Sequence, residues 1–201
     1  TQVPLRGAAR WVTRPKPAAC QDDRVAAIAG AQPSLEQILA DARALIEVES
    51  PSEDLAAVAA SASVVEAVVT SRLAQAGVAA HAESIKIDGC SHLRWRVGNG
   101  GKVLVLTHHD TVWPLGSLAH RPFTVEDGVL TGPGCFDMKV GLAQAVHAIS
   151  LIAQAVGPDA AHGVTLLVTG DEEIGSPTSR ALIEAEAKGK DAVFVLEASG
   201  P

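Results

Sequence analysis

The chain has 201 residues, of which 47% are hydrophobic and only 3% aromatic, so one medium-sized domain with a core of Ala, Val, Leu and Ile is expected. Its net charge of −7 argues against a nucleic-acid partner, because such proteins present a basic face to the phosphates. Three scattered cysteines, Cys20, Cys90 and Cys135, are too few for a disulfide framework and favour the reducing cytoplasm.

The N-terminal segment, residues 1–33, is predicted to be a loose arm, because it contains several prolines and little hydrophobic periodicity. It also lacks the apolar stretch that a secretory signal peptide requires. A structured domain is therefore expected over residues 34–201.

Two helices are predicted at the start of this domain. Ser34 begins a capping-box pattern for the first helix, and Pro51 ends it. Ser52 is the expected N-cap of the second, an Ala- and Val-rich helix that runs to about Gly77. The apolar part of this second helix carries a glutamate and two serines, so we expect it to be too short and too polar to span a membrane.

Short apolar runs then alternate with helical segments. Strands are expected at residues 78–86, 91–97, 102–107, 164–169 and 192–196, and helices at 138–156 and 178–188. An Asp-Gly pair within residues 122–132 predicts a hairpin. The last three of these strands are apolar on both faces, which predicts buried strands of a largely parallel sheet in an α/β domain.

Polar side chains follow three of these strands at the point where each strand ends. They are His108, His109 and Asp110 after the first, Asp171, Glu172 and Glu173 after the second, and Glu197 after the third, while Asp137 opens the long helix. Because ligands gather beyond the carboxyl ends of parallel strands, these side chains are expected to meet in one crevice. Carboxylates drawn together repel each other, and a divalent cation would relieve that repulsion. Histidine with carboxylates suits zinc, with manganese and cobalt as alternatives.

The alternation of side chains along a strand distinguishes the two histidines. Residues two apart face the same side, so Asp110 can accept a hydrogen bond from the ring of His108, while His109 faces the packed interior. His108 is therefore the predicted metal ligand, and Asp110 is the residue that orients it. A nearby carboxylate that does not bind the metal can serve as the base for a metal-bound water.

Simpler interpretations stay open for some of these residues. Glu172 and Glu173 could be the solvated first turn of a helix, and Asp137 could cap the long helix. Cys135 is interpreted as a packing thiol rather than a ligand. Local roles are expected for Lys139 and Arg180 in ion pairs and for His120, His147 and His162 in structural contacts. Trp113 could line the cleft, and a core or rim position is equally open.

Four motifs carry a family resemblance. HHDTVWPLGSL, GPGCFDMKVG, DEEIGS and VLEASGP resemble those of dinuclear zinc metallopeptidase family 20, which includes glutamate carboxypeptidase, acetylornithine deacetylase and succinyl-diaminopimelate desuccinylase. The resemblance covers residues 34–201 and implies a three-layer αβα catalytic domain with a mostly parallel mixed sheet. The run HHDTVWPLGSLAHRPF is most similar to the glutamate carboxypeptidase branch.

The resemblance implies a role for each residue of the cluster. The implied zinc ligands are His108 and Glu197 for the first ion, Glu173 for the second, and Asp137 for both. Glu172 would be the general base and acid, and Asp110 would hold the His108 ring. The peptide bond after the bridging aspartate is usually cis in this family, so the Asp137–Met138 bond is expected to be cis.

The resemblance also implies a function. The parent protein would be a zinc-dependent hydrolase of amide bonds, of the carboxypeptidase or N-acyl-amino-acid deacylase type, acting on a small molecule or peptide with a free carboxylate. Family members are longer, carry a lid domain after the position of Glu197, form homodimers through that lid, and supply a late histidine to the second zinc. The chain therefore resembles the N-terminal part of such a catalytic domain. The alternative is a truncated, non-catalytic fragment that binds one metal or a partner chain.

Overall fold

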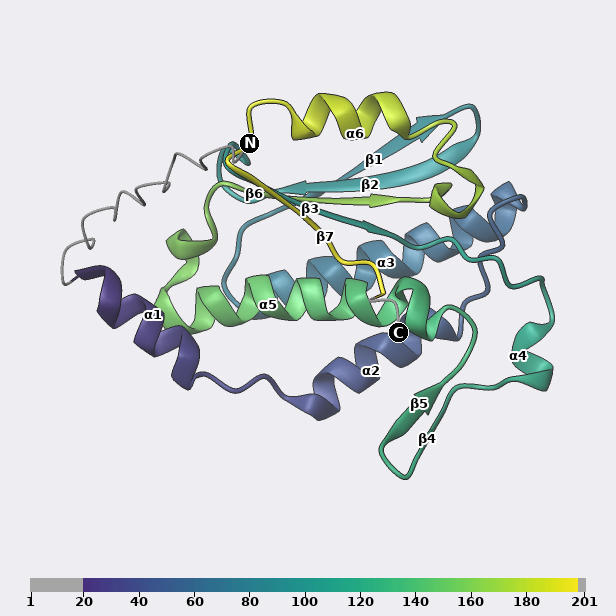
Figure 1. Cartoon of the computed structure of the whole chain (residues 1–201), viewed down its shortest axis with the longest axis horizontal. Helices are drawn as coiled ribbons and strands as arrows, with labels where there is room; N and C mark the ends of the chain where they lie inside the picture. Colours follow the sequence, from purple (N-terminus) through teal and green to yellow (C-terminus); the bar gives the residue numbers. More distant parts are fainter. Residues whose placement is uncertain (1–19, 199–201) are drawn as a thin grey trace, which may run out of the picture.

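The computed structural model describes residues 20–198, which form a five-stranded sheet with helices on both faces (Figure 1). The strands follow the order β1 (Ala82–Ile87), β2 (Cys90–Arg96), β6 (Val164–Thr169), β3 (Val103–His108) and β7 (Ala192–Val195). β3 runs parallel to β6 and β7, whereas β2 runs antiparallel to β1 and β6. The predicted α/β class with a mixed sheet is confirmed, and the parallel strands are those that carry the polar ends.

Helices pack on the two faces of this sheet (Figure 1). One face is covered by α3 (Leu55–Gln75) and α5 (Val140–Val156), with α2 (Leu35–Ile46) packed against both, and the other face carries α6 (Arg180–Ala187). The shorter elements are α1 (Cys20–Gly30), α4 (Ser117–His120), the hairpin strands β4 (Thr124–Glu126) and β5 (Val129–Thr131), the π-helical turn η1 (Cys135–Lys139), and the 3-10 turns η2 (Pro158–Ala161) and η3 (Glu172–Ile174).

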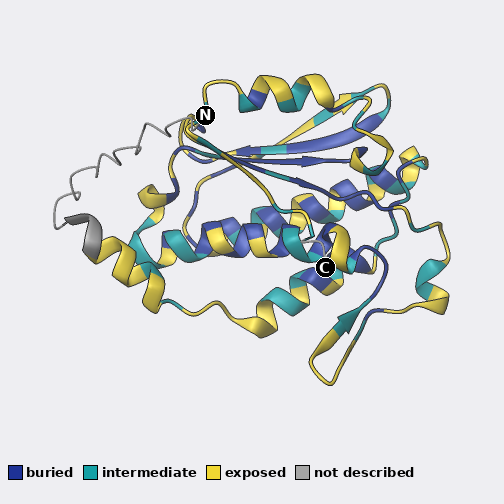
Figure 2. Cartoon of the chain, in the orientation of Figure 1, coloured by how far each residue is buried: buried dark blue, intermediate teal, exposed yellow. Residues whose placement is uncertain are grey.

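The main hydrophobic core lies between the sheet and the pair α3–α5 (Figure 2). Trp95 and Val168 from the sheet meet Leu73 of α3 and Leu142 of α5, and all four side chains are fully buried. Burying one such side chain stabilises the fold by about 1.5–3 kcal/mol. This packed layer holds the strands in place, so the loops at the strand ends start from fixed positions.

Helix capping follows the sequence in one case and departs from it in another. The Ser34 hydroxyl accepts a hydrogen bond from the Gln37 N–H at 3.3 Å, as predicted. At α3 the N-cap is Asp54, whose Oδ1 accepts hydrogen bonds from the N–H groups of Ala56 and Ala57, at 3.0 and 2.9 Å. The prediction that Ser52 caps this helix is wrong, because the buried Ser52 hydroxyl donates instead to the carboxylate of Asp110.

Part of the segment predicted to be a loose arm is helical. Residues 20–30 form α1, which packs against α5, and the rest of the arm up to residue 19 lies outside the described residues. Alanines and an arginine favour a helix here, and the prolines that suggested a loose arm all precede or follow it.

Two helical segments are long and apolar enough to cross a membrane by length and composition alone, α3 and residues Cys135–Val156. The expectation that the second predicted helix is too short for this does not hold, because α3 has 21 residues. In the structure both segments bury one side in the core, through Val65 and Val69 of α3 and through Leu142 and Val146 of α5. The apolar composition is therefore accounted for by packing against the sheet.

A strand forms at residues 192–195 as predicted, but the prediction that its side chains are buried is wrong. β7 forms as expected, but Val193, Phe194 and Val195 are exposed. β7 is the edge strand of the sheet and pairs with β3 alone, so only one of its sides meets another strand of the described chain. An apolar sequence run cannot distinguish a central strand from an edge strand.

The predicted Asp-Gly hairpin is confirmed in β4 and β5. Asp127 and Gly128 both have positive φ angles, 50° and 79°, which is the backbone of the tight two-residue turn that this pair favours. The hairpin leads directly into η1 and so toward the polar strand ends.

Candidate active site

The residues predicted to meet in one crevice come together around the ring of His108. This histidine ends β3, the Glu172–Glu173 pair lies in η3 after β6, Glu197 follows β7, and Asp137 lies in η1. Because β3, β6 and β7 are adjacent in the sheet, and β6 and β7 run parallel to β3, their carboxyl ends share one edge.

Both ring nitrogens of the fully buried His108 face acidic residues. Nδ1 lies 3.0 Å from the backbone oxygen of Asp110 and 3.2 Å from its Oδ1, so Nδ1 carries the proton and donates. Nε2 points toward three carboxylates, 3.1 Å from Asp137 Oδ1, 3.7 Å from Glu197 Oε1 and 3.8 Å from Glu172 Oε2. Burial alone would lower the pKa of His108, but Asp110, Glu197 and Glu172 outweigh it and raise the pKa to about 9.

The carboxylate of Asp110 joins the end of β3 to the turn that follows β6. Its two oxygens accept hydrogen bonds from the backbone N–H groups of Glu172 and Glu173, each at 3.2 Å, and Oδ2 accepts from the Ser52 hydroxyl at 2.6 Å. Burial alone would raise the pKa of Asp110, but the hydrogen bonds from His108 and Ser52 keep it below the usual range. Asp110 therefore stays charged and positions both the His108 ring and the η3 turn.

The carboxylates that face His108 are crowded. Burial, with further contributions from Asp137 and Glu172, raises the pKa of Glu197 to about 7 against the opposing effect of His108. Burial and the charge of Asp137 likewise raise the pKa of Glu173. Burial is the largest cause of both raised pKa values, and the neighbouring carboxylates add to it, so this site disfavours the charged form of these two glutamates.

The donor set fits a divalent metal. In two groups, His108–Glu172–Glu197 and His108–Asp137–Glu173, one ligand atom per residue lies within 4.8 Å of the others. The Nε2 atom of a neutral His108 would face only acceptor oxygens, and a cation between them resolves that conflict. One imidazole with carboxylates is a donor set that zinc accepts. Glu172 stands as close to His108 as Glu197 does, so distance alone does not separate a ligand from a base.

The structure does not support the interpretation of Asp137 as a helix cap or of Glu172 and Glu173 as the first turn of a helix. The carboxylate of Asp137 does not cap α5, which begins at Val140 with no side-chain cap, and it turns toward His108 instead. Glu172 and Glu173 open only a three-residue 3-10 turn, whose first amides are held by Asp110. The Asp137–Met138 peptide bond is cis, as the family resemblance implied.

The buried side chain of Lys139 does not form the expected ion pair. Its Nζ donates to the backbone oxygens of Leu45 and Val48, at 2.9 and 2.7 Å, where α2 ends. Burial lowers the pKa of Lys139 to about 8. Orphan carbonyls at a helix end are good partners for a cation, and the lysine so anchors η1 to α2. Arg180 does form a local pair, at 3.5 Å from Glu184.

The second histidine of the pair faces inward, as predicted. The ring of His109 is completely buried, with Nδ1 at 3.1 Å from the Ser61 hydroxyl and Nε2 at 3.1 Å from the Ser91 carbonyl. Burial lowers the pKa of His109 to about 4. His147 is also structural, since its Nε2 lies 2.8 Å from a carboxylate oxygen of Asp41.

A second buried polar cluster, which was not predicted from the sequence, is formed by Cys90, His92 and Asp171. His92 Nδ1 accepts the N–H of Gly170 at 3.2 Å, and its Nε2 lies 3.0 Å from the Thr178 hydroxyl. That hydroxyl donates in turn to Asp171 Oδ2 at 2.7 Å. The cluster therefore ties down the loop that carries Glu172, with both ring nitrogens of His92 already in use. The alternation of Cys90 and His92 along β2 was the available sequence signal.

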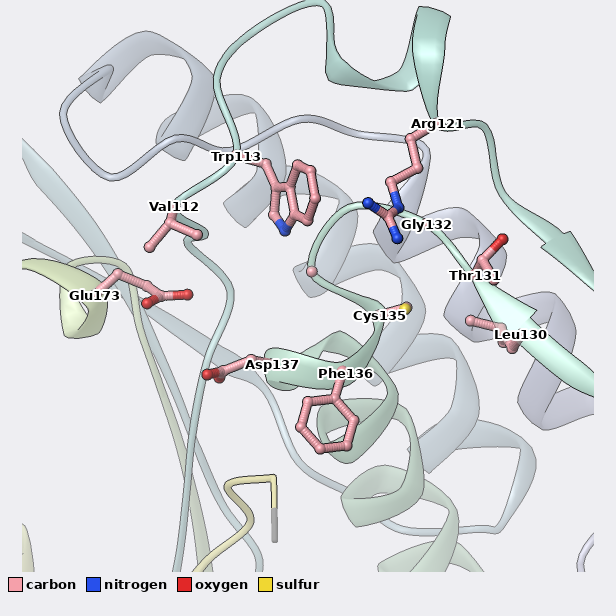
Figure 3. A pocket seen from close by; sticks show the side chains of 11 residues that line it. Val112, Trp113, Arg121, Leu130, Thr131, Gly132, Cys135, Phe136, Asp137 and Glu173 are labelled. Atoms are coloured by element: carbon pink, nitrogen blue, oxygen red, sulfur yellow. The ribbon is translucent and has the colours of Figure 1, made fainter. Parts of the chain in front are cut away.

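A cavity of about 370 Å³ opens beside the cluster (Figure 3). Asp137 and Glu173 lie on one side of it, and Trp113 and Arg121 line another part of it. Trp113 therefore lines the cleft, which was one of the positions expected for it. Cys135 also lines the cavity and is a free thiol.

A three-layer α/β domain with a histidine and several carboxylates at the carboxyl ends of its strands is an arrangement that can hold a metal ion. Residues 104–201 match the model of Peptidase family M20/M25/M40, and this match confirms the resemblance that the four motifs carry.

Relatives of known activity support the match. Carboxypeptidase G2 from Pseudomonas sp. (strain RS-16) is 43% identical over 102 residues, which cover 50% of this chain and 24% of the relative. A succinyl-diaminopimelate desuccinylase from Methylobacterium nodulans is 37% identical over 115 residues, covering 53% and 29%. The match thus spans only about a quarter of the length of these curated relatives.

Solved structures share the fold. An M20 family metallo-carboxypeptidase, Sso-CP2 from Sulfolobus solfataricus, superposes with a TM-score of 0.59 at 23% identity, covering 82% of this chain and 37% of that one. Human carnosine dipeptidase 1 gives a TM-score of 0.55 at 18% identity, covering 90% and 41%. At such identities the likeness concerns the fold alone.

Proposed function

We propose that the protein to which this chain belongs hydrolyses amide bonds with the help of bound zinc, as a carboxypeptidase or an N-acyl-amino-acid deacylase. The observation that carries the proposal is the convergence of three carboxylates within 3.8 Å of His108 Nε2. The match of residues 104–201 to the peptidase family model supports it. When bound, the metal supplies a Lewis acid that polarises the scissile carbonyl and lowers the pKa of the attacking water.

We assign the metal-holding role to four side chains and leave the fifth for proton transfer. Bound zinc would be held by His108, Asp137, Glu173 and Glu197, and Asp137 would contribute to both ions. Glu172 takes the proton from the water and passes it to the leaving amine. Its side chain is 45% exposed and so can reach a substrate, while its backbone is held by Asp110. Asp110 keeps the Nδ1–H of His108 engaged, so that Nε2 faces the metal.

The substrate in this proposal is a small molecule or peptide with a free carboxylate, and the complete protein is a homodimer. We infer a cytoplasmic location, which the free thiols of Cys90 and Cys135 support. Cobalt and manganese are expected to replace zinc, because the donor set is one nitrogen with several oxygens.

A second candidate function is a non-catalytic segment that binds one metal or a partner chain. It is favoured by the fact that, among residues 20–198, the groups able to hold a metal at this site contain a single imidazole. Tight catalytic zinc sites usually use more than one nitrogen ligand, which would leave this chain with one firmly held ion.

The decisive experiment loads the chain with zinc and measures both metal content and hydrolysis of N-acyl amino acids and dipeptides. For Glu172→Gln we expect a loss of about 10²–10⁴-fold in turnover with unchanged metal content, because only the proton carrier is removed. Glu184→Gln, at an exposed position of α6, is the matched control and should retain activity. Undiminished turnover in Glu172→Gln would overturn the assignment, and zinc binding without any hydrolysis would favour the second candidate.

A further inference from the structure

One arginine, Arg121, lines the cavity beside the carboxylate cluster (Figure 3). Asp137 and Glu173, which belong to the proposed metal site, line one side of it, and Arg121 lines another part of it. Its volume of about 370 Å³ falls within the range of pockets that bind small molecules. A substrate whose amide lies at the carboxylate cluster would therefore extend toward Arg121.

Arg121 is held in place without using its charge in an ion pair. Its guanidinium stacks over the Trp113 ring, 5.1 Å from the ring centre. No acidic group among the described side chains lies within 4.0 Å of it. A guanidinium presents a planar fork of donors that matches a carboxylate, and stacking on an aromatic ring restricts its orientation in advance.

The backbone around Arg121 is also fixed. Its N–H donates to the Ser117 carbonyl at 2.8 Å, and the buried side chain of Phe123 follows two residues later. The turn before it is tied down by Glu49, which accepts from the N–H groups of Gly116 and Leu118 at 2.7 and 2.8 Å. Arg121 is therefore presented from an anchored loop rather than from a free surface segment.

We propose that this cavity binds the part of the substrate that carries a carboxylate and that Arg121 is the residue that selects for it. The inference rests on the proposed function, because it places the scissile amide at the His108 cluster. Trp113 and the exposed ring of Phe136 flank the methylene groups between the amide and the carboxylate. A single arginine beside a strongly acidic site suits one carboxylate rather than a phosphate, which carries more charge.

The first arm of the test measures binding without catalysis. Glutarate is titrated into the metal-free chain, and tryptophan fluorescence follows the change at Trp113. We expect Arg121→Gln to weaken glutarate binding about tenfold or more and Arg121→Lys to restore part of it, because a lysine keeps the charge without the fork. Arg180→Gln, which removes an exposed arginine on α6, should bind as the unaltered chain does. Equal binding by Arg121→Gln would overturn the proposal.

The second arm measures kcat/KM for N-acetylglutamate, for N-acetylglutamine, which lacks the side-chain carboxylate, and for N-acetylisoglutamine, which lacks the α-carboxylate. The unaltered protein should prefer N-acetylglutamate over one of the two amides about tenfold or more, and that amide identifies the carboxylate that Arg121 binds. Arg121→Gln should abolish this preference mainly through KM, whereas Arg180→Gln should keep it.

The two arms separate failure of this proposal from failure of the proposed function. Absence of hydrolysis with all three compounds would count against the function, while glutarate binding that depends on Arg121 would still support the cavity as an anion site. Hydrolysis with a preference that survives Arg121→Gln would overturn the role of Arg121 and leave the proposed function in place.

Discussion

Two clusters of histidine and acidic side chains lie at the same edge of the sheet, yet they differ in how their hydrogen bonds are satisfied. Around His92, each ring nitrogen has a protein partner, and Asp171 accepts hydrogen bonds from the N–H groups and hydroxyl of the loop that it caps. Around His108, Nδ1 is satisfied by Asp110, but Nε2 faces three carboxylates. Both ring nitrogens of His92 are thus satisfied by the protein, although Asp171 Oδ1 has no hydrogen-bond partner among the described residues. Nε2 of His108 instead faces only acceptor oxygens, which a proton or a bound cation can satisfy. The partners of the two histidine rings, rather than the residue types, therefore distinguish the two clusters.

The largest expected difference between the clusters is in metal affinity. His108→Ala removes the single imidazole of the site, and zinc affinity measured by chelator competition should fall about 100-fold or more. His92→Ala should leave zinc affinity within a few-fold and instead lower the free energy of unfolding by about 1–3 kcal/mol, because it leaves buried partners unsatisfied. Similar zinc affinities for the two variants would break the comparison.

Substituting the aspartate of each cluster, Asp110 or Asp171, should give the next largest difference in zinc affinity. Asp110→Asn removes the charge that orients His108, so zinc affinity should fall about 10–100-fold. Asp171→Asn should act mainly on stability, since Asp171 Oδ2 accepts from Thr178 and Ser179 rather than facing the metal site. Calorimetric titration with zinc and urea unfolding of both variants measure the two effects. A larger loss of zinc affinity in Asp171→Asn than in Asp110→Asn would contradict the assignment.

Removing the hydroxyl group that donates to each aspartate should give a smaller difference between the clusters in zinc affinity. Ser52→Ala removes the 2.6 Å hydrogen bond to Asp110, and Thr178→Val removes the link between His92 and Asp171. Each should lower the free energy of unfolding by about 1–3 kcal/mol, the cost of a lost hydrogen bond to a buried charge. Only Ser52→Ala should also weaken zinc binding, by a few-fold. Ser63→Ala, an exposed position of α3, is the control for loss of a hydroxyl.

The smallest expected effect is a difference in pH dependence between the two histidines in the metal-free chain. Burial lowers the pKa of His92, so its contribution to stability is lost as the pH falls below the unfolded value near 6.5. The pKa of His108 is raised to about 9, so its contribution is present below pH 6.5 and is lost as the pH rises toward 9.

Urea unfolding across this pH range tests both signs. His92→Gln should flatten the acidic limb of the stability curve, and His108→Gln should flatten the alkaline limb. Addition of zinc should suppress the alkaline loss in the unaltered chain, because the metal replaces the proton on Nε2. An alkaline limb that is unchanged by His108→Gln would show that other groups control it.

Much of the fold follows from local patterns. The Ser34 cap, the Asp-Gly hairpin and the apolar runs before His108, Glu172 and Glu197 lie where the sequence predicts them. Side-chain alternation along β3 also distinguished His108 from His109 correctly. These features depend on neighbours within a few residues, which a sequence contains directly.

Other features depended on contacts between distant segments. Ser52 does not cap the helix as expected, because its hydroxyl donates to the carboxylate of Asp110, 58 positions away. Lys139 does not form the expected ion pair, because its ammonium donates to backbone carbonyls at the end of α2. The exposure of β7 follows from its edge position, and the His92 cluster forms from β2 and the loop after β6. None of these partners is near in sequence, so no local pattern indicates them.

The sequence by itself determined which side chains would end the parallel strands, because apolar runs and turn residues set where each strand begins and ends. The tertiary structure alone decided which of those groups are satisfied by the protein and which are left facing one another. Hydrogen-bond satisfaction depends on distances of a few ångströms between residues that are far apart in the chain, and only packing sets those distances.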